Sequence, residues 1–236
     1  MLTLAIETAT DTSSVVVTEE GEELAGWRQV TRQDLCRRLA GEVGRVLEAA
    51  TRTFHDLDLV CVGLGPGSFT SLRVGLATAK GLCLARHLPL VGIPSLAAMA
   101  WQMRHLVTGL ACPVLDARRG EVYAGLFRAR DDRVERAQEE FVADAVGLAD
   151  RLRATCEPVT VFGQTDLVPL ATIEAALEGK ATLLREPPVV PDAAAIAHLG
   201  KGRFREHGAD DLSSLHPIYV RKSYAEEKFD LDLGLR

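Results

Sequence analysis

A glycine-rich turn between a predicted strand and a predicted helix constrains the fold more than any other segment. The turn, Gly65 to Ser68, follows an apolar run over residues 57–64 and precedes a helical pattern over residues 69–86. Such a turn presents backbone N–H groups at the positive end of a helix dipole, and Ser68 is placed to cap that helix. The segment therefore predicts either an anion site or only a tight strand-to-helix connection. Its glycine spacing matches neither GxxxxGKS/T nor GxGxxG.

The helix predicted over residues 69–86 is apolar almost all round. Leu72 belongs to its main apolar stripe, and Leu82 lies off that stripe. A surface helix normally has one apolar stripe, so this helix needs cover on two sides. Gly75 and Gly81 each cost about 1 kcal/mol of helix stability relative to Ala, which the close approach of another backbone would explain. Two interpretations stay open: a helix between its own sheet and a partner protein, or a helix fully buried in one large domain.

Composition limits the size of the fold and the kind of partner. The chain has 236 residues, of which 47% are hydrophobic, enough for one large or two modest domains. Its 27 Lys and Arg residues and 33 Asp and Glu residues give a net charge of −6, which argues against tight binding of nucleic acid by the chain alone. The five cysteines form no CxxC pair, and neither a signal peptide nor a membrane span is visible. We therefore expect a soluble, cytoplasmic protein with reduced thiols.

The order of predicted elements indicates an α/β fold of two similar halves. A three-strand meander is followed by alternating helices and strands, which is the order of a ribonuclease H-like fold, and the second half again begins with strands. We therefore expect an N-terminal ribonuclease H-like subdomain over residues 1–107 and a degenerate copy over residues 108–236. The predicted strands cover residues 2–6, 13–18, 24–30, 57–64, 89–93, 113–119, 121–127, 133–142, 159–162 and 181–184, and the predicted helices cover residues 31–50, 69–86, 95–105, 144–153, 166–178 and 192–206.

Four motifs resemble, in their order along the chain, those of the TsaB (YeaZ) family. They read AIETAT from Ala5, GPGSFTSLRVGLATAKGL from Gly65, DARRGEVY from Asp116 and PIYVR from Pro217. The resemblance covers essentially the whole chain. The family usually reads GPGSFTGLR, where this chain has Ser71.

A second departure from the family pattern lies at the start of the first predicted helix. The family commonly has a His-Ser pair there, and this chain has Gln33 and Asp34. Any role of that histidine is therefore not carried over to this chain.

The resemblance implies an actin-like ATPase (ASKHA) architecture and a mainly non-catalytic role in the biosynthesis of tRNA threonylcarbamoyladenosine (t6A). Proteins of this family pair with TsaD, which transfers the threonylcarbamoyl group to an adenine beside the tRNA anticodon. A TsaE-like ATPase joins the pair, and TsaC supplies the threonylcarbamoyl adenylate. The resemblance thus implies a scaffold or activating subunit that meets tRNA only through the complex. We expect the chain alone to bind no cofactor, with ATP or ADP and a metal held in the partner complex.

The loops that hold phosphates in actin-like ATPases lack the expected glycines in this chain. Close approach of the backbone to a nucleotide requires glycine. The first loop carries hydroxyls and a carboxylate instead, and the second carries two arginines before Gly120. We therefore expect at most residual contacts to a nucleotide or anion. The candidates for such contacts are Thr8, Thr10, Asp11, Ser68, Arg118 and Arg119.

The sequence indicates no metal centre and no catalytic residue. Its six histidines show no pair at metal-ligand spacing. Glu7, Asp11 and Asp116 are better interpreted as solvated or capping carboxylates than as metal ligands. The segment around Ser68 is not the GxSxG elbow of a serine hydrolase. An autonomous actin-like ATPase or kinase is the alternative function, and a peptidase is a weaker one.

The helices predicted over residues 31–50 and 69–86 form the candidate partner surface. The family resemblance places contacts on these helices, in a four-helix arrangement with TsaD or with a second copy. We expect a homodimer when the chain is alone, and we expect Leu39 and Leu72 to be suitable probes. The candidate interface residues are Leu35, Leu39, Val43, Phe69, Leu72, Arg73 and Leu76.

Overall fold

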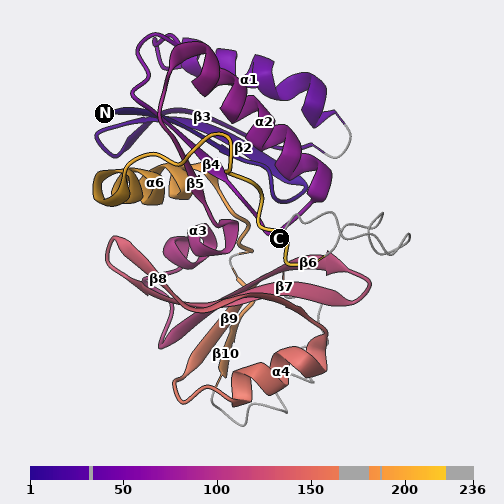
Figure 1. The fold of residues 1–236 in the computed structure, drawn as a ribbon. Coiled ribbons are helices and arrows are strands. Elements are labelled where there is room, and N and C mark those ends of the chain that lie inside the picture. Colours follow the sequence, from indigo (N-terminus) through magenta and orange to yellow (C-terminus); the bar gives the residue numbers. More distant parts are fainter. Residues whose placement is uncertain (32–33, 165–180, 187, 222–236) are drawn as a thin grey trace. The chain divides into compact units, whose positions relative to one another are not determined.

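The chain folds into two compact units, each built on one sheet (Figure 1). The structure is a computed structural model that describes residues 1–31, 34–164, 181–186 and 188–221. The first unit combines Met1–Ala98 with Pro191–Ile218, and the second combines Met99–Val190 with Tyr219–Arg236. The expected division at residues 107 and 108 is therefore wrong in two respects. The first segment ends earlier, and a late segment returns to the first unit because it supplies a helix that covers the first sheet.

The first unit contains a mixed five-stranded sheet in the order β3-β2-β1-β4-β5. The first three strands form an antiparallel meander, and the last two run parallel to β1. All six residues of β1 are buried, because this central strand is covered on both faces. The strand bounds are β1 Leu2–Glu7, β2 Thr12–Glu19, β3 Glu22–Val30, β4 Leu59–Gly63 and β5 Leu90–Ile93.

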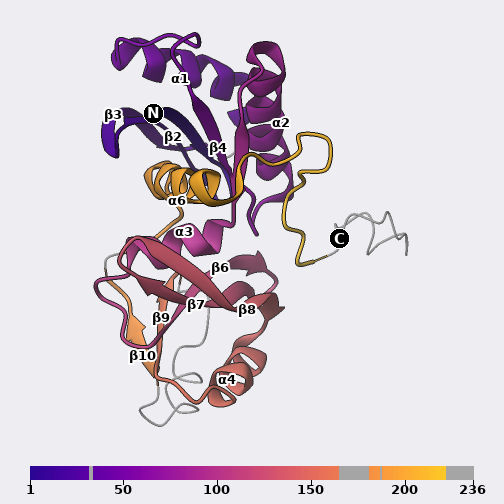
Figure 2. The same cartoon turned by 60° about the vertical axis from the view of Figure 1, so that its left-hand side comes forward.

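Helices cover both faces of this sheet (Figures 1 and 2). Helices α1 (Leu35–Ala49) and α2 (Phe69–Arg86) lie on one face and contact each other, and α6 (Ala193–His207) lies on the other. Gly200 lets α6 approach β4 closely, since a Cβ at this position would come under 3.0 Å from the sulfur of Cys61. Each face of the sheet is thus closed by apolar packing.

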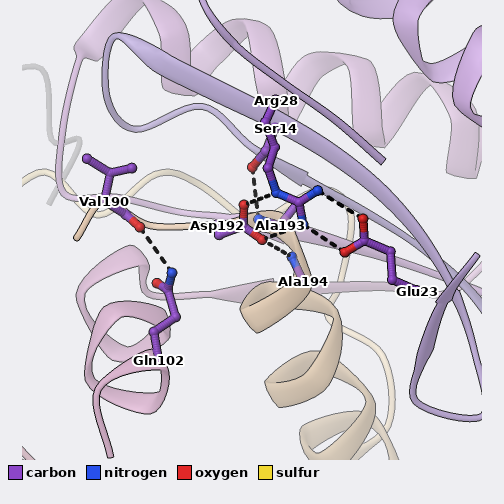
Figure 3. Close-up of polar contacts among 8 residues, drawn as sticks. All are labelled: Ser14, Glu23, Arg28, Gln102, Val190, Asp192, Ala193 and Ala194. Atoms are coloured by element: carbon purple, nitrogen blue, oxygen red, sulfur yellow. Dashed lines mark hydrogen bonds and ion pairs between the residues drawn. The ribbon is translucent and has the colours of Figure 1, made fainter. Parts of the chain in front are cut away.

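An arginine fork fixes the start of α6 against β3 (Figure 3). The Arg28 guanidinium contacts the carboxylates of both Glu23 and Asp192, with Nε 2.6 Å from Asp192 Oδ2. Asp192 also caps α6 by accepting the N–H of Ala194, and the N–H of Ala193 donates to Ser14 Oγ on β2. The start of α6 is therefore bound both to β2 and to β3.

The segment after α6 protects the outer edge of the first sheet. Asp210 N–H donates to Leu90 O, and its carboxylate accepts the N–H of Gly92. The Arg203 guanidinium holds the same carboxylate, and further along Ile218 N–H donates to Leu64 O. This strap, residues 208–218, thus satisfies Leu90 O and the Gly92 N–H on edge strand β5 and, after β4, Leu64 O.

The second unit repeats the topology of the first. Its sheet has the order β10-β9-β6-β7-β8, with β6, β7 and β8 in an antiparallel meander and β9 and β10 parallel to β6. Helix α4 (Ala145–Arg153) is capped by Asp144, which accepts the N–H of Gly147. The predicted α/β architecture of two ribonuclease H-like halves is confirmed. The strand bounds are β6 Leu110–Arg118, β7 Glu121–Arg130, β8 Arg133–Ala143, β9 Val159–Gly163 and β10 Ala181–Leu184.

The predicted elements that fall on described residues are all present, with shifts at their ends. The helix expected from residue 31 begins at Leu35, because Thr31 is tied to the first meander through Asp11 O and the Ser13 hydroxyl. Helix α3 (Ser95–Gln102) ends before the expected residue 105. The helix predicted over residues 166–178 lies outside the described residues.

Candidate functional site

The glycine turn and the first turns of α2 pack against the residues that directly follow strand β1. A Cβ at Gly67 would come under 3.0 Å from Ala9 O, and one at Gly75 would come equally close to Thr8 Oγ1. Ala9 O accepts the N–H of Ser68 at 2.7 Å, and the Thr8 hydroxyl donates to Ser71 O at 2.9 Å. The glycines therefore let the β1–β2 connection pack against the first turns of α2. Of the two interpretations, this geometry favours the tight strand-to-helix connection.

Ser68 stands at the N-cap position of α2 without acting as a side-chain cap. It makes no side-chain hydrogen bond to a backbone N–H, and its hydroxyl pairs with that of Ser71 at 3.0 Å. The predicted capping bond is therefore wrong. Ser71, which stands where the family usually has Gly, supplies the partner hydroxyl.

The other candidate contacts in the first unit also have internal partners. The Thr10 hydroxyl donates to Thr12 O, and Asp11 O accepts the N–H of Thr31. Thr8 and Ser68 join these residues at the end of β1 and the start of α2, so the fold brings all four into one region of the first unit.

The two candidate arginines lie in the β6–β7 turn of the second unit. Arg118, Arg119 and Gly120 have φ values of 66°, 58° and 78°. The left-handed conformation costs roughly 1–2 kcal/mol at a non-glycine residue, so two arginines here make a strained turn. Asp116 stabilises it by accepting the Arg118 N–H at 2.7 Å, which agrees with the capping role expected for this carboxylate.

Arg221 holds the same turn from the C-terminal segment. Its guanidinium contacts Glu121 Oε2 at 2.8 Å and Ala117 O at 3.3 Å. The side chain of Arg118 is 73% exposed, so this turn presents a guanidinium to solvent. Within the described ranges, no group of three or more His, Cys, Asp or Glu side chains is arranged to hold a metal ion.

Most of the candidate interface residues face the core of their own unit. Five of the seven are buried, because the apolar stripes of α1 and α2 pack on the first sheet. Leu39 and Leu72 are 0% and 1% exposed, so neither probe offers a surface to a partner. The five buried candidates are Leu35, Leu39, Val43, Leu72 and Leu76.

The remaining two candidates, Phe69 and Arg73, lie at the start of the outward face of α2. The Arg73 guanidinium stacks on the Phe69 ring, 3.9 Å from its centroid. Further along this face are the exposed residues Ala77, Gly81 and Leu84, and Leu84 is 63% exposed. The described residues therefore do not bury α2 completely, and beyond Arg73 its outward face carries the apolar or small residues Ala77, Gly81 and Leu84.

The outward face of α1 carries two glycines that sequence reasoning missed. A Cβ at Gly41 or Gly44 would meet no atom of the described chain within 4 Å, and the same holds for Gly81 on α2. These three glycines have no packing role inside the described structure. The sequence feature that could have identified them is the GxxG spacing of Gly41 and Gly44 on the polar side of an amphipathic helix.

Comparison with known proteins assigns a family to the chain. The TsaD family model, described as tRNA N6-adenosine threonylcarbamoyltransferase, matches residues 29–153, which is more than half of the chain. The chain belongs to this family. Within it, the chain is similar over almost its whole length to proteins named TsaB, so the resemblance stated from the four motifs is confirmed.

Two curated relatives and one solved structure illustrate this similarity. The tRNA threonylcarbamoyladenosine biosynthesis protein TsaB of Bacillus subtilis and that of Escherichia coli are each 29% identical to the chain, over 97% of it and 98% of their own length. The structure of YeaZ from Pseudomonas aeruginosa has a TM-score of 0.75 at 21% identity and covers 92% of this chain and 99% of its own. The likeness to YeaZ supports the fold. Among the described helices, none is long and apolar enough to pass through a bilayer.

Proposed function

We propose that the chain is the TsaB-type subunit of the bacterial t6A synthase and acts there as a scaffold or activator. The observation that carries this proposal is the full-length similarity to two proteins named for tRNA threonylcarbamoyladenosine biosynthesis. The match to the TsaD family model supports descent from a common ancestor with the transferase.

The chain is proposed to have no catalytic activity of its own. In the glycine turn, the Ser68 N–H already donates to Ala9 O, and the Thr8 hydroxyl already donates to Ser71 O, so both donors have partners inside the chain. The second turn presents bulky arginines where close backbone approach to phosphates would need glycine. These observations favour a supporting role over the alternative, an autonomous actin-like ATPase or kinase.

The outward face of α1 and α2 is the proposed partner surface. It carries exposed Gly41 and Gly81 and half-buried Gly44, which weaken the helices without a packing gain among the described residues. A partner helix seated there would use the space of the missing side chains, and exposed Leu84 would supply apolar contact area. The proposed occupant is a TsaD-like subunit, with a second copy of this chain in its place when the chain is alone.

The rest of the proposed assembly follows the family resemblance. A TsaE-like ATPase joins the pair in the cytoplasm, and ATP or ADP and a metal are held in the partner complex. Because the chain carries a net charge of −6, tRNA is proposed to bind through the complex and not to the chain alone.

Reconstitution tests the function. The chain, a TsaD-like protein and a TsaE-like protein from the same organism are mixed with threonylcarbamoyl adenylate, ATP and unmodified tRNA, and t6A is measured by mass spectrometry. We expect t6A to form only when the chain is present. Unchanged t6A formation without the chain would contradict the proposal, and ATP turnover by the pure chain above background would favour the alternative.

A pair of matched glycine variants tests the surface. Gly81 on α2 and Gly202 on α6 are both exposed, and a Cβ at either would meet no described atom within 4 Å. Gly81→Arg should abolish binding of the TsaD-like protein, and Gly202→Arg, on the opposite side of the sheet, should leave it unchanged. Equal binding by both variants would place the interface elsewhere.

A further inference from the structure

Glu7 is a carboxyl group enclosed at the end of the central strand of the first sheet. Its side chain is completely buried. Ala9 N–H donates to Oε1 at 2.6 Å, and the Ser95 hydroxyl donates to Oε2 at 2.7 Å. The carboxyl also lies against β4, since a Cβ at Gly63 would come under 3.0 Å from Oε2. Of the two roles expected for this carboxyl group, the solvated one is therefore wrong, whereas the acceptance of the Ala9 N–H agrees with the capping one.

Both donors to Glu7 also bind the glycine turn. The Ser95 hydroxyl accepts the N–H of Gly65 at 3.1 Å, and Ser95 N–H donates to Gly65 O at 2.7 Å. Ala9 O accepts the N–H of Ser68, the residue before α2. The carboxyl group is thus the common point of two hydrogen-bonded links that fix the turn and the start of α2.

The part of the chain that the structure describes supplies no hydrogen-bonded positive charge to balance an ionised Glu7. Its described hydrogen-bond partners are one hydroxyl and backbone N–H groups from the β1–β2 connection. A nearby charged group is another carboxylate, Asp192 at the start of α6, which Arg28 binds and which also disfavours the ionised form. An ionised Glu7 is therefore a buried negative charge without a counter-ion among the described residues.

We propose that Glu7 is a proton-dependent latch: as the neutral acid it holds the glycine turn and the start of α2, and its ionisation loosens this corner of the first unit. In the neutral state Glu7 Oε2–H donates to Ser95 Oγ, which has a second lone pair for the N–H of Gly65, so both links persist. In the ionised state the same links surround a charge that is more stable in water.

The direction of the pH effect follows from linkage. Burial raises the pKa of Glu7 from its ordinary 4.5 to about 7, against the opposing effect of the hydrogen bonds from Ser95 and Ala9. The folded chain therefore binds this proton more tightly than the unfolded chain. The stability that Glu7 contributes is complete below about pH 4.5 and is lost as the pH rises through about 7.

Urea unfolding of the full chain at pH 6 and pH 8 tests the latch. The Glu7 contribution should raise the unfolding equilibrium constant of the unchanged protein about tenfold between these pH values. Glu7→Gln, which is neutral at both, should lack that rise. An equal rise in the two proteins would overturn the proposal.

Glu42→Gln is the matched control for loss of a buried carboxyl group. Glu42 on α1 is also buried, but the guanidinium groups of Arg45 and Arg38 hold its pKa below the usual range. This variant should keep the tenfold rise. If Glu7→Gln does not fold, Ser95→Ala takes its place: loss of the donating hydroxyl should move the fall in stability to higher pH, and an unmoved pH profile would count against the latch.

The latch has one consequence for partner binding, and that consequence rests on the proposed function, because α2 carries the proposed partner surface. Affinity for the TsaD-like protein should fall from pH 6 to pH 8 in the unchanged chain more than in Glu7→Gln. Because unfolding is measured on the chain alone, a failed latch appears as an equal pH effect on unfolding of the unchanged chain and Glu7→Gln. A failed partner assignment leaves that result intact and appears only as a lack of binding to the TsaD-like protein.

Discussion

The carbonyl oxygen of Ala9 lies in the space that a side chain at position 67 would need. A Cβ built at Gly67 would come under 3.0 Å from this oxygen, which accepts the N–H of Ser68 at 2.7 Å. The absence of a side chain at Gly67 therefore allows a hydrogen bond between two backbone segments that lie far apart in sequence. A phosphate at this N–H would have to displace that carbonyl.

Alanine at the packed glycines of α2 and its turn should destabilise the first unit. Gly67→Ala and Gly75→Ala place a methyl group against Ala9 O and Thr8, and we expect each to lower the free energy of unfolding by about 1–3 kcal/mol. Gly81→Ala is the control, because its methyl group meets no described atom and should raise helix stability by up to about 1 kcal/mol. Urea unfolding of the three variants gives the comparison. Equal stabilisation by all three would refute the packing role.

The apolar residues of α1 and α2 should separate into core and surface positions. Leu39→Ala and Leu72→Ala remove buried side chains, and each should lower the free energy of unfolding by about 2–5 kcal/mol. Leu84→Ala, at a side chain that is 63% exposed, should change it by less than about 0.5 kcal/mol. Thermal and urea unfolding measure both effects. Small losses at Leu39 or Leu72 would mean that these side chains do not face the core.

Asp192 should stabilise the first unit more as a helix cap than as an ion partner. Asp192→Ala removes the acceptor for the Ala194 N–H and should lower the free energy of unfolding by about 1 kcal/mol, and Asp192→Asn should keep most of this stability. A double-mutant cycle with Arg28→Ala should give a coupling below about 1 kcal/mol, since the Arg28 side chain is 41% exposed. A larger coupling would make the ion pair the main contribution.

The cysteines should divide into two classes in the native protein. Cys36 and Cys156 are exposed, whereas Cys61, Cys83 and Cys112 are buried. Burial raises the pKa of Cys83 and of Cys112 to about 12, so few thiolates form at neutral pH. We expect iodoacetamide to label only the two exposed cysteines until urea is added, as read by peptide mass spectrometry. Rapid labelling of Cys112 in the native protein would contradict this prediction, because it would mean that the apolar core of the second unit opens without urea.

The Asp210 carboxylate should protect the edge of the first sheet. Asp210→Ala leaves the Gly92 N–H without its acceptor, and we expect a loss of about 1–3 kcal/mol in the free energy of unfolding together with faster hydrogen exchange at Gly92. Asp211→Ala, which removes hydrogen bonds only within the exposed strap, should have a smaller effect. If the Gly92 amide exchanges hydrogen at similar rates in both variants, the Asp210 carboxylate does not protect this strand edge.

Local patterns predicted the elements well, because strands and helices depend on periodicity and caps that lie within one stretch of sequence. Asp144 and Asp192 begin the helical runs predicted from residues 144 and 192, and both accept a backbone N–H at the start of a helix. The order of elements was also sufficient to predict two ribonuclease H-like halves, since short connections restrict the topology.

Burial and long-range contacts were harder to predict. Leu39 and Leu72 were expected at a partner surface, but apolar spacing identifies a stripe without saying what covers it. Ser95, which donates to the buried Glu7, lies 88 residues away from it, and Arg28 and Asp192, which meet at the start of α6, are 164 residues apart. No local pattern carries such information.

The discontinuous first unit determines the order in which a ribosome allows it to fold. Residues 1–98 emerge early, but α6, which packs against β1, β2, β4 and β5, is made only after residues 99–190. One apolar face of a nearly complete sheet therefore stays uncovered by α6 while residues 99–190 are synthesised. A nascent chain in this state is a substrate for chaperones and prone to aggregation.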